Sequence, residues 1–470
     1  MELRPGCHVH LMGICGTAMA SLAGLLKDRG FHVTGSDAHP YPPMSTQIEN
    51  LGIQLQKGYR AENLQPKPDF VIVGNVISAN NPEAIELNRL QIPFTSLPKA
   101  MGELIIAEKE SIVVSGTHGK TTTTSLMAWI LEQAQEKPGF LIGGIPKNFA
   151  QSFRNPEKKY FVIEGDEYDT AYFDKVPKFI HYKPRHVILT SVEFDHADIY
   201  KDLDDVKKSF TKLMELIPVD GHLVACYDDQ NVRDLIGKTK CKNVYTYGLT
   251  GGDYQVFIQS EKGEEIVFQL NHQGQLLGEF HLPMAGQYNV LNATAVIVMA
   301  LQLGLKLEQI QKSLTDFLGV KRRQEVLGEP GGVLLIEDFA HHPTAVRETI
   351  KGIHAKYHGR KVFSVFEPRS ATSRRKVFQK DYVEAFKNAH EVILAEAFDQ
   401  SKIDSENRFS SGELVDDLKN HQVTAHVFSG ADQIVQYIQA HAKPGDAVLI
   451  MSNGGFDGIY GKLTSALEKT

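Results

Sequence analysis

A glycine- and threonine-rich stretch, VVSGTHGKTTTTS from Val113 to Ser125, has the residue types that hold a phosphate. The common phosphate-binding loop reads G-x-x-x-x-G-K-[ST], and here Val114 takes the place of its first glycine. An apolar strand precedes the loop and a helix-like run follows, so the free N–H groups of the helix start would face an anion. Lys120 would reach the outer phosphates of a nucleotide, and the Thr121 hydroxyl would bind Mg²⁺. The remaining loop residues of this candidate site are Gly116, Thr117, His118, Gly119 and Thr122.

Two acidic clusters follow strand-like apolar runs downstream of this loop. In a parallel sheet, ligands gather at the carboxyl ends of the strands, so both clusters would meet the phosphate loop at one edge. Carboxylate oxygen suits Mg²⁺, and a neutral histidine can complete such a site. The alternative is a set of solvated loop acids. The clusters VIEGDEYD and SVEFDHADIY supply Glu164, Asp166, Glu167, Asp169, Glu193, Asp195, His196 and Asp198.

A second glycine-containing turn, GICGTAM at Gly13–Met19, lies between a strand-like and a helix-like run. Its G-x-x-G spacing departs from the G-x-G-x-x-G of dinucleotide-binding turns. A diphosphate could still bind at the helix start, and Asp37, after Ser36 at the end of the next strand, could bind a ribose or base. The turn leaves open a nicotinamide-dependent dehydrogenase and a plain structural turn.

Polar side chains in the second half of the chain extend the candidate site. Asn289 and Asn292 share one helix face, where paired amides can bind a purine edge, and two polar residues near a helix start are the alternative. Arg323, beside Arg322, could neutralise charge on a transferred phosphoryl group, and a surface arginine at a linker is the alternative. Three later strands end in polar residues, which favours a substrate pocket. These residues are Asp338, His341, His342, Arg369, Ser370, Thr372, Arg374, Arg375, Ser452 and Asn453.

The elements that must position these residues form three blocks in a chain of 470 residues. Strand-like and helix-like runs alternate in the first and third blocks, which predicts parallel sheets. We predict an α/β fold with a Rossmann-like domain over residues 1–107, a central P-loop domain over 108–316 and a second Rossmann-like domain over 317–470. Alternating apolar and polar residues from Val244 to Leu282 predict additional antiparallel strands beside the central sheet. Helices are expected from about Thr17, around residues 206–216 and over about 288–303.

Composition argues against several classes of partner. The net charge of −7 gives no reason to expect nucleic acid or an anionic membrane. The sequence has no long apolar h-region at its start and no segment apolar enough to span a bilayer. Its four cysteines form no C-x-x-C pair, which argues against a disulfide framework or a zinc site. We therefore expect a cytoplasmic protein that is a monomer or a weak homo-oligomer.

Taken in order, these motifs resemble the Mur ligase family over essentially the whole chain. GTHGKTTT is similar to the family's ATP loop, which lacks the first glycine. GICGTAM and DFAHHPT resemble the branch that acts on UDP-N-acetylmuramate. SDAHPYPPMST, FEPRSAT and MSNGGF resemble the members of that branch that attach a peptide. The resemblance implies an ATP- and Mg²⁺-dependent ligase. It would join UDP-N-acetylmuramate to the tripeptide L-Ala-γ-D-Glu-meso-diaminopimelate through an acyl phosphate, in peptidoglycan recycling.

The same resemblance implies roles for individual residues. Thr121, Glu164 and His196 would hold the metal, and Asn289, Asn292, Arg323 and Asp338 would contact the nucleotide. The UDP-sugar would lie against Gly13, Cys15, Gly16, Thr17, Ser36, Asp37 and Asn75, and the tripeptide against Arg369, Ser452 and Asn453. His342 is our candidate base for the attacking amine, with packing of a turn as the alternative. The chain departs from the family at Tyr288, where histidine is frequent, and at Ser191, where asparagine is common. Lys207 stands where some relatives carry a carbamylated lysine.

Three other functions remain as alternatives. The ligase that adds L-alanine alone usually reads HHPTE, where this chain has HHPTA. A nicotinamide-dependent dehydrogenase would bind NAD and ignore ATP. A non-catalytic regulator would bind ATP without forming an amide, and the combination of Lys120, Thr121, Glu164 and His196 argues against it.

Overall fold

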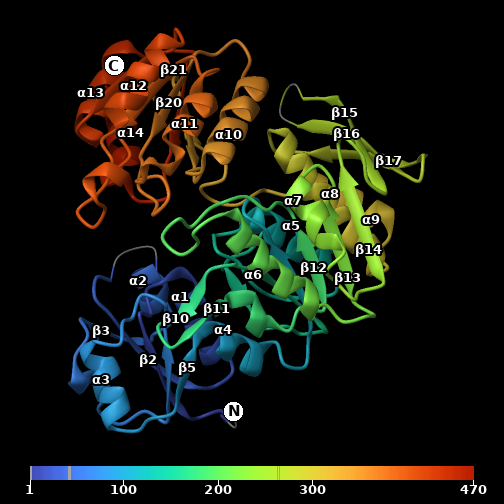
Figure 1. Ribbon diagram of the computed structural model, residues 1–470, viewed down its shortest axis with the longest axis vertical. Helices are drawn as coiled ribbons and strands as arrows, with labels where there is room; N and C mark the ends of the chain where they lie inside the picture. The colour runs from blue at the N-terminus through green and yellow to red at the C-terminus, as the bar shows by residue number, and fades with distance from the viewer. Residues whose placement is uncertain (1–2, 41–43, 262, 264, 470) are drawn as a thin grey trace.

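The computed structural model describes residues 3–40, 44–261, 263 and 265–469 of the chain. They form three large sheets flanked by helices, which follow one another along the chain (Figure 1). A small two-stranded sheet is made by β10 (Asp169–Ala171) and β11 (Asp174–Pro177). In the resembling segment SDAHPYPPMST, Tyr41, Pro42 and Pro43 lie outside the described residues. None of the described helices combines the length and the apolar character needed to cross a bilayer. All four cysteines are free thiols.

The first sheet has five parallel strands in the order β3-β2-β1-β4-β5. Helix α1 begins at Thr17, as predicted, and buries every residue from Met19 to Leu26. Its tight packing depends on a small residue, because a Cβ on Gly24 would overlap the ring of Phe153 in the central part of the chain. The elements are β1 (His8–Met12), α1 (Thr17–Asp28), β2 (His32–Asp37), α2 (Met44–Asn50), β3 (Gln54–Lys57), β4 (Phe70–Val73), α3 (Pro82–Arg89), β5 (Phe94–Ser96) and α4 (Leu97–Ala100).

The central sheet has ten strands in the order β17-β16-β15-β14-β13-β12-β6-β9-β7-β8. Its middle strands are β6 (Glu110–Ser115), β9 (Tyr160–Gly165), β12 (His186–Leu189) and β13 (His222–Cys226). They are parallel and nearly level, since Ser115 pairs with both Gly165 and Leu189. The phosphate loop and both acidic clusters therefore leave the sheet at the same edge, as the sequence predicted. The flanking elements are α5 (Lys120–Gln133), β7 (Gly139–Leu141), β8 (Phe153–Arg154), α6 (Leu203–Leu216), α7 (Gln230–Ile236), α8 (Gln287–Gln302) and α9 (Leu307–Thr315).

The strands between Val244 and Leu282 differ in part from the prediction. Only β15 (Tyr254–Ser260), β16 (Ile266–His272) and β17 (Gln275–Leu282) pair in antiparallel fashion. Strand β14 (Asn243–Gly248) is parallel to both β13 and β15. It follows a crossover through helix α7, and such a connection returns the chain in the parallel direction. These strands extend the central sheet rather than standing beside it (Figure 1).

The third sheet has six strands in the order β18-β19-β23-β20-β21-β22, and only β18 is antiparallel. Adjacent parallel strands β19, β23 and β20 end next to Phe339, Ser452 and Glu367, so these segments share one edge. The elements are β18 (Glu325–Gly328), β19 (Leu334–Asp338), α10 (Pro343–Lys356), β20 (Val362–Phe366), α11 (Gln379–Phe386), β21 (Glu391–Ala395), α12 (Ser411–Asn420), β22 (Thr424–Phe428), α13 (Ala431–His441), β23 (Ala447–Met451) and α14 (Ile459–Leu467).

Candidate active site

A cavity of about 1040 Å³ opens where the carboxyl ends of the three sheets converge. Residues from all three blocks line it, so no single block of the chain makes the site. The lining includes Gly16, Thr17 and Asn75 from the first block, His118–Thr122, Glu164, Asp166 and His196 from the second, and Asp338 and His341 from the third.

The phosphate loop is shaped by two glycines with left-handed backbone angles. Gly119 has φ of +81° and caps helix α5, and Gly116 has φ of +133°. A Cβ on Gly116 would overlap Thr190 Oγ1 on the neighbouring strand end, so a side chain is excluded there. Ser191 holds the loop in place, since its carbonyl accepts from the Thr117 amide at 2.9 Å and its hydroxyl accepts from the His118 amide at 3.1 Å. The amides at the start of α5 have no partner within the helix and are free to face an anion.

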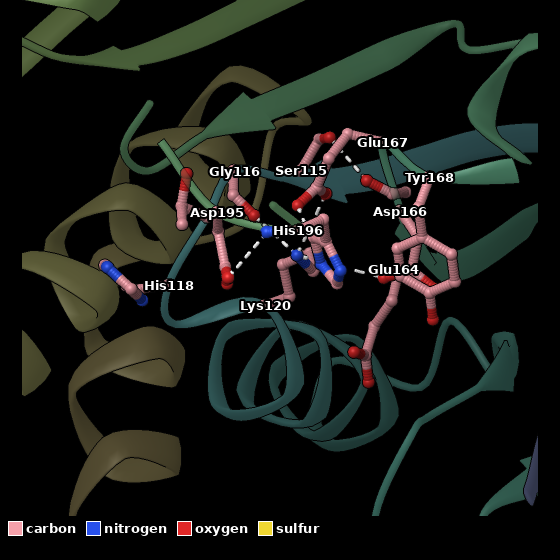
Figure 2. Close-up of polar contacts among 12 residues, drawn as sticks. Ser115, Gly116, His118, Lys120, Glu164, Asp166, Glu167, Tyr168, Asp195 and His196 are labelled. Carbon is pink, nitrogen blue, oxygen red and sulfur yellow. Dashed lines mark hydrogen bonds and ion pairs between the residues drawn. The ribbon is translucent and has the colours of Figure 1, made fainter. Parts of the chain in front are cut away.

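Lys120 lies at the centre of the loop and is held by three oxygen-bearing neighbours. Its ammonium donates to the Gly116 carbonyl at 2.7 Å and to Glu167 Oε2 at 3.1 Å, and it lies 3.8 Å from Asp166 Oδ1. Figure 2 shows this arrangement at the N-terminus of α5. Burial works against the charge of Lys120, but the carboxylates of Glu167 and Asp166 outweigh it and raise the pKa of the ammonium. The lysine is therefore a fixed cation beneath the candidate phosphate position.

Thr121 and Glu164 offer a set of oxygen ligands that suits Mg²⁺. The Thr121 hydroxyl donates to Glu164 Oε2 at 3.0 Å, and Glu164 Oε1 accepts from the Gly143 amide at 2.5 Å. Burial, with Asp166 nearby, raises the pKa of Glu164. His196 enters the same cavity, but its Nε2 lies 3.5 Å from Glu167 Oε1 and pairs with that carboxylate. Thr121 and Glu164 thus contact each other directly. His196 contacts the neighbouring acid, Glu167, in the same cavity.

The predicted nucleotide residues gather beside the phosphate loop. Asn292 donates to Asn289 Oδ1 at 3.5 Å, both amides are buried, and the Asn292 oxygen lies against Gly119. Arg323 donates to Thr121 Oγ1 at 3.3 Å and stacks on Phe339. Asp338 accepts from the amides of Gln324 and Ala340, and burial raises its pKa. All four predicted residues line the cavity together with Tyr288.

The first block delivers only part of its predicted substrate residues to the cavity. Gly16, Thr17 and Asn75 line it. Ser36 does not, because its fully buried hydroxyl donates to Glu83 Oε2 at 2.6 Å. The backbone amide of Cys15 is already bonded to Asp37 Oδ2 at 3.0 Å, and its thiol is buried. Gly13, with φ of +80°, lies against Val76 and Tyr59 instead. Ser36, Cys15 and Asp37 are therefore held by contacts within the first block, and their part in binding the UDP-sugar stays a prediction.

The third-block residues predicted to meet the peptide form a cluster outside the cavity lining. The buried Ser452 hydroxyl donates to Glu367 Oε2 at 2.5 Å, and Arg369 donates to Glu367 Oε1 at 3.1 Å. The Arg369 guanidinium also stacks 3.7 Å from the centre of the Phe398 ring. Asn453 contributes a buried side-chain oxygen without a hydrogen-bond partner among the described residues. Ser452 and Arg369 thus meet at Glu367 outside the lining of the cavity, and binding of the peptide by this segment stays a prediction.

The segment Glu193–Asp195, here called the docking segment, ties the third block to the central sheet. The Thr344 hydroxyl donates to Glu193 Oε2 at 2.7 Å, and the Thr372 hydroxyl donates to Asp195 Oδ1 at 2.6 Å. His118 from the phosphate loop lies 3.3 Å from the same Glu193 oxygen. Burial opposes the charge of Glu193, but the contacts with His118 lower its pKa to about 2. One carboxylate thus joins the phosphate loop to the third block.

His342, the candidate base for the attacking amine, is held by contacts between the third block and the docking segment. It lies outside the main cavity, where His341 is found instead. Its Nε2 donates to the Phe194 carbonyl at 3.1 Å, and its Nδ1 accepts from the Thr344 amide at 3.3 Å, which caps helix α10. His118, Glu193 and His342 bring possible metal ligands within 4.8 Å of one another. Because the Nδ1 lone pair of His342 already receives the Thr344 amide, we assign this group to packing between the blocks.

Two lysines lie where the sequence analysis did not place them. Lys207, at the position of the carbamylated lysine of some relatives, points away from the cavity and donates to Asp234 on helix α7 at 2.9 Å. Lys178, which no motif singled out, lines the cavity and donates to Asp166 Oδ2 at 3.0 Å. Its sequence context, KVPKF, holds no recognisable signal beyond a cation that follows an acidic strand end.

Three family models match the chain in succession. The Mur ligase family catalytic domain matches residues 8–109, the Mur ligase middle domain matches 114–300, and the Mur ligase glutamate ligase domain matches 322–454. Together these matches cover most of the chain.

Full-length relatives agree with these matches. The UDP-N-acetylmuramate–L-alanyl-γ-D-glutamyl-meso-2,6-diaminoheptandioate ligase of Escherichia coli is 37% identical over 462 residues, with 98% of each chain covered. The UDP-N-acetylmuramate–L-alanine ligase of Clostridium tetani is 34% identical over 447 residues, with 95% of each covered. The crystal structure of a murein peptide ligase from Psychrobacter arcticus aligns with a TM-score of 0.74 at 35% identity, covering 99% of each chain. The α/β fold on three sheets is thereby confirmed.

Proposed function

The chain belongs to the Mur ligase family, and from this premise we propose that it joins UDP-N-acetylmuramate to L-alanyl-γ-D-glutamyl-meso-diaminopimelate with hydrolysis of ATP. The observation that carries the proposal is the phosphate loop with Lys120 and Thr121 facing Glu164 in a cavity that all three blocks line. The peptide as acceptor is supported by the Escherichia coli relative, whose name gives that tripeptide. None of the relatives named above is a nicotinamide-dependent dehydrogenase.

The reaction brings two anions together, and the site offers positive charge where they meet. A carboxylate oxygen of the sugar's lactyl group attacks the γ-phosphorus of ATP, the bond to ADP breaks, and an acyl phosphate forms. The peptide's amine then attacks the acyl carbon, loses a proton and displaces inorganic phosphate. Lys120 and the N–H groups of α5 stabilise charge on the transferred phosphoryl group. Arg323, 3.3 Å from the Thr121 hydroxyl, adds a further cation on the nucleotide side.

A magnesium ion fits the residues present. Thr121 and Glu164 are oxygen ligands, and the buried carboxyl of Glu164, with its raised pKa, has the surroundings of a group that a cation would complete. When bound, Mg²⁺ would neutralise phosphate charge. His196, which pairs with Glu167 in the same cavity, is a further candidate ligand.

The third block has the contacts needed to close the site over bound nucleotide. Thr344 and Thr372 reach the docking segment, and Glu193 in that segment touches His118 of the phosphate loop. We propose that these contacts form when the third block closes, which would exclude water from the acyl phosphate.

Formation of the amide product by mass spectrometry tests the proposal. The assay contains ATP, Mg²⁺, UDP-N-acetylmuramate and the tripeptide. A matched pair of variants is Lys120→Met in the loop and Lys137→Met on the exposed pair with Glu157. The proposal expects product from the wild type and from Lys137→Met, and loss of product from Lys120→Met. Full activity in Lys120→Met would contradict it.

A further inference from the structure

Lys178 is a second buried lysine in the cavity, on the 3₁₀ turn Lys178–Tyr182 that follows strand β11 (Asp174–Pro177). Its side chain is 11% exposed, close to the 13% of Lys120. The ammonium donates to Asp166 Oδ2 at 3.0 Å and to the Tyr168 hydroxyl at 2.9 Å. Lysines are rarely so enclosed without a charged partner or a ligand.

Asp166 stands between the two cavity lysines and contacts each with a different oxygen. Oδ2 accepts from Lys178, and Oδ1 lies 3.8 Å from Lys120. The two ammonium groups are therefore separated by a single carboxylate group. Since Lys120 belongs to the phosphate loop, Lys178 marks a second positive position one carboxylate away from the phosphates.

Lys178 retains its charge and keeps one donor to spare. Burial disfavours the ammonium, but Asp166 outweighs this effect and raises the pKa of Lys178. An ammonium has three N–H donors. Asp166 and Tyr168 take two of them, and the polar contacts among the described residues assign no acceptor to the third. A buried cation with an unused donor at a cavity wall is suited to an anionic ligand.

The position of Lys178 identifies which anion it faces. The turn that carries it packs against helix α4, whose Leu97 and Pro98 line the cavity beside Gly16 and Thr17 of the first block. Lys178 therefore lies between the phosphate loop and the wall formed by the first block. Under the proposed function, that is the path from the sugar nucleotide to the γ-phosphate.

We propose that Lys178 binds the carboxylate of the sugar substrate that attacks ATP, while Lys120 binds the phosphate that receives it. This inference rests on the proposed function. As the new bond between the carboxylate oxygen and phosphorus forms and ADP leaves, Lys178 keeps its proton and its hydrogen bond to the acyl oxygen. Pairing each anion with its own lysine lowers the repulsion between them in a site of low dielectric constant. Asp166 and Tyr168 position the lysine.

Steady-state kinetics of Lys178→Met, with Lys175→Met as the matched control, tests this assignment. Lys175 is 64% exposed and pairs with Asp169, so its variant should behave as the wild type. For Lys178→Met we expect kcat/KM for UDP-N-acetylmuramate to fall by about 100-fold or more, the scale of losing one charged stabilising group. ADP affinity should stay within about threefold of the wild type, because Lys120 and the loop remain. Lys178→Arg, which keeps the charge, should recover part of the loss.

The outcomes separate this inference from the proposed function. Wild-type turnover with the sugar nucleotide and tripeptide establishes the function independently of Lys178. Unchanged kcat/KM for the sugar in Lys178→Met would overturn the assignment while leaving the function in place. Equal losses of ADP affinity and sugar turnover in both Lys178→Met and Lys178→Arg would also overturn it, since the lysine would then hold the site together rather than bind the carboxylate.

Discussion

The hydrogen bond between Thr372 and Asp195 provides the sharpest test of how the third block is held in place. Replacing Thr372 with valine removes the hydroxyl and keeps the shape of the side chain. Thr372 is 2% exposed, and its hydroxyl donates to the buried carboxylate of Asp195 at 2.6 Å, so this is a charge-assisted hydrogen bond in a buried interface. Loss of such a bond costs about 1.5–3 kcal/mol. Thr372 does not line the cavity, so ligand contacts stay intact.

If Thr372 contacts Asp195 only when the third block is closed, losing this hydrogen bond destabilises the closed arrangement and leaves the open arrangement unchanged. At about 1.4 kcal/mol for each tenfold change, the closed fraction relative to the open one falls by about 10- to 150-fold. Because the amine must reach the acyl phosphate in the closed state, kcat/KM for the tripeptide should fall by a similar factor. ADP affinity should change far less, since the loop and α8 are untouched.

The assay is phosphate release as a function of tripeptide concentration, together with small-angle scattering in the presence of an ATP analogue and the sugar nucleotide. The matched control is Thr464→Val, which removes a hydroxyl that donates to the Tyr460 carbonyl within helix α14. Wild-type kinetics and wild-type compaction in Thr372→Val would refute the reasoning. Equal losses in both threonine variants would point to general destabilisation of the third block.

Three further predictions concern the loop, the metal ligand and pH. Gly119→Ala should weaken ADP binding, because φ of +81° costs about 1–2 kcal/mol for alanine and the added methyl would overlap Asn292. The control Gly274→Ala, with φ of +80° and open space around it, should lower stability without changing ADP binding. Glu164→Gln should raise the Mg²⁺ concentration for half-maximal phosphate release by at least about tenfold, as loss of a charged ligand predicts, whereas Glu157→Gln at the surface should not. The thermal midpoint should fall as pH drops from 6.5 toward 4, because burial lowers the pKa of His10 to about 3 and those of His186 and His342 to about 4. These groups stay neutral in the fold but take up protons when unfolded, so stability is full above 6.5 and is lost below it. A midpoint that rises or stays level over that range would contradict this assignment.

The edge where the cavity forms could be predicted because its signals are local. Apolar runs alternate with helix-like runs, and this alternation predicts parallel strands. Parallel strands place Lys120, Glu164 and His196 at one edge of the sheet, whatever the order of the strands within it. The same reasoning placed Asn289 and Asn292 on one face of α8. The parallel direction of β14 was missed, since alternation of apolar and polar residues does not distinguish antiparallel from parallel pairing at a sheet edge.

The contacts that the sequence did not predict join side chains that are distant in the sequence. The Ser36 hydroxyl donates to Glu83, and no strand or turn signal links these two residues. Asp195 and Thr372 are 177 residues apart, and no periodicity relates them. The turn after β11 places Lys178 in the cavity, and a lysine in the sequence does not by itself predict burial. Contacts of this kind come from packing of complete blocks, which the sequence pattern does not encode locally.

Acceptor choice is the most direct test of the central claim. Phosphate release should be measured with ATP, Mg²⁺ and UDP-N-acetylmuramate, in parallel reactions that receive either L-Ala-γ-D-Glu-meso-diaminopimelate or free L-alanine. The account predicts strong turnover with the tripeptide and little with L-alanine. Strong turnover with L-alanine and none with the tripeptide would contradict it, and would assign the chain to the reaction named for the Clostridium tetani relative.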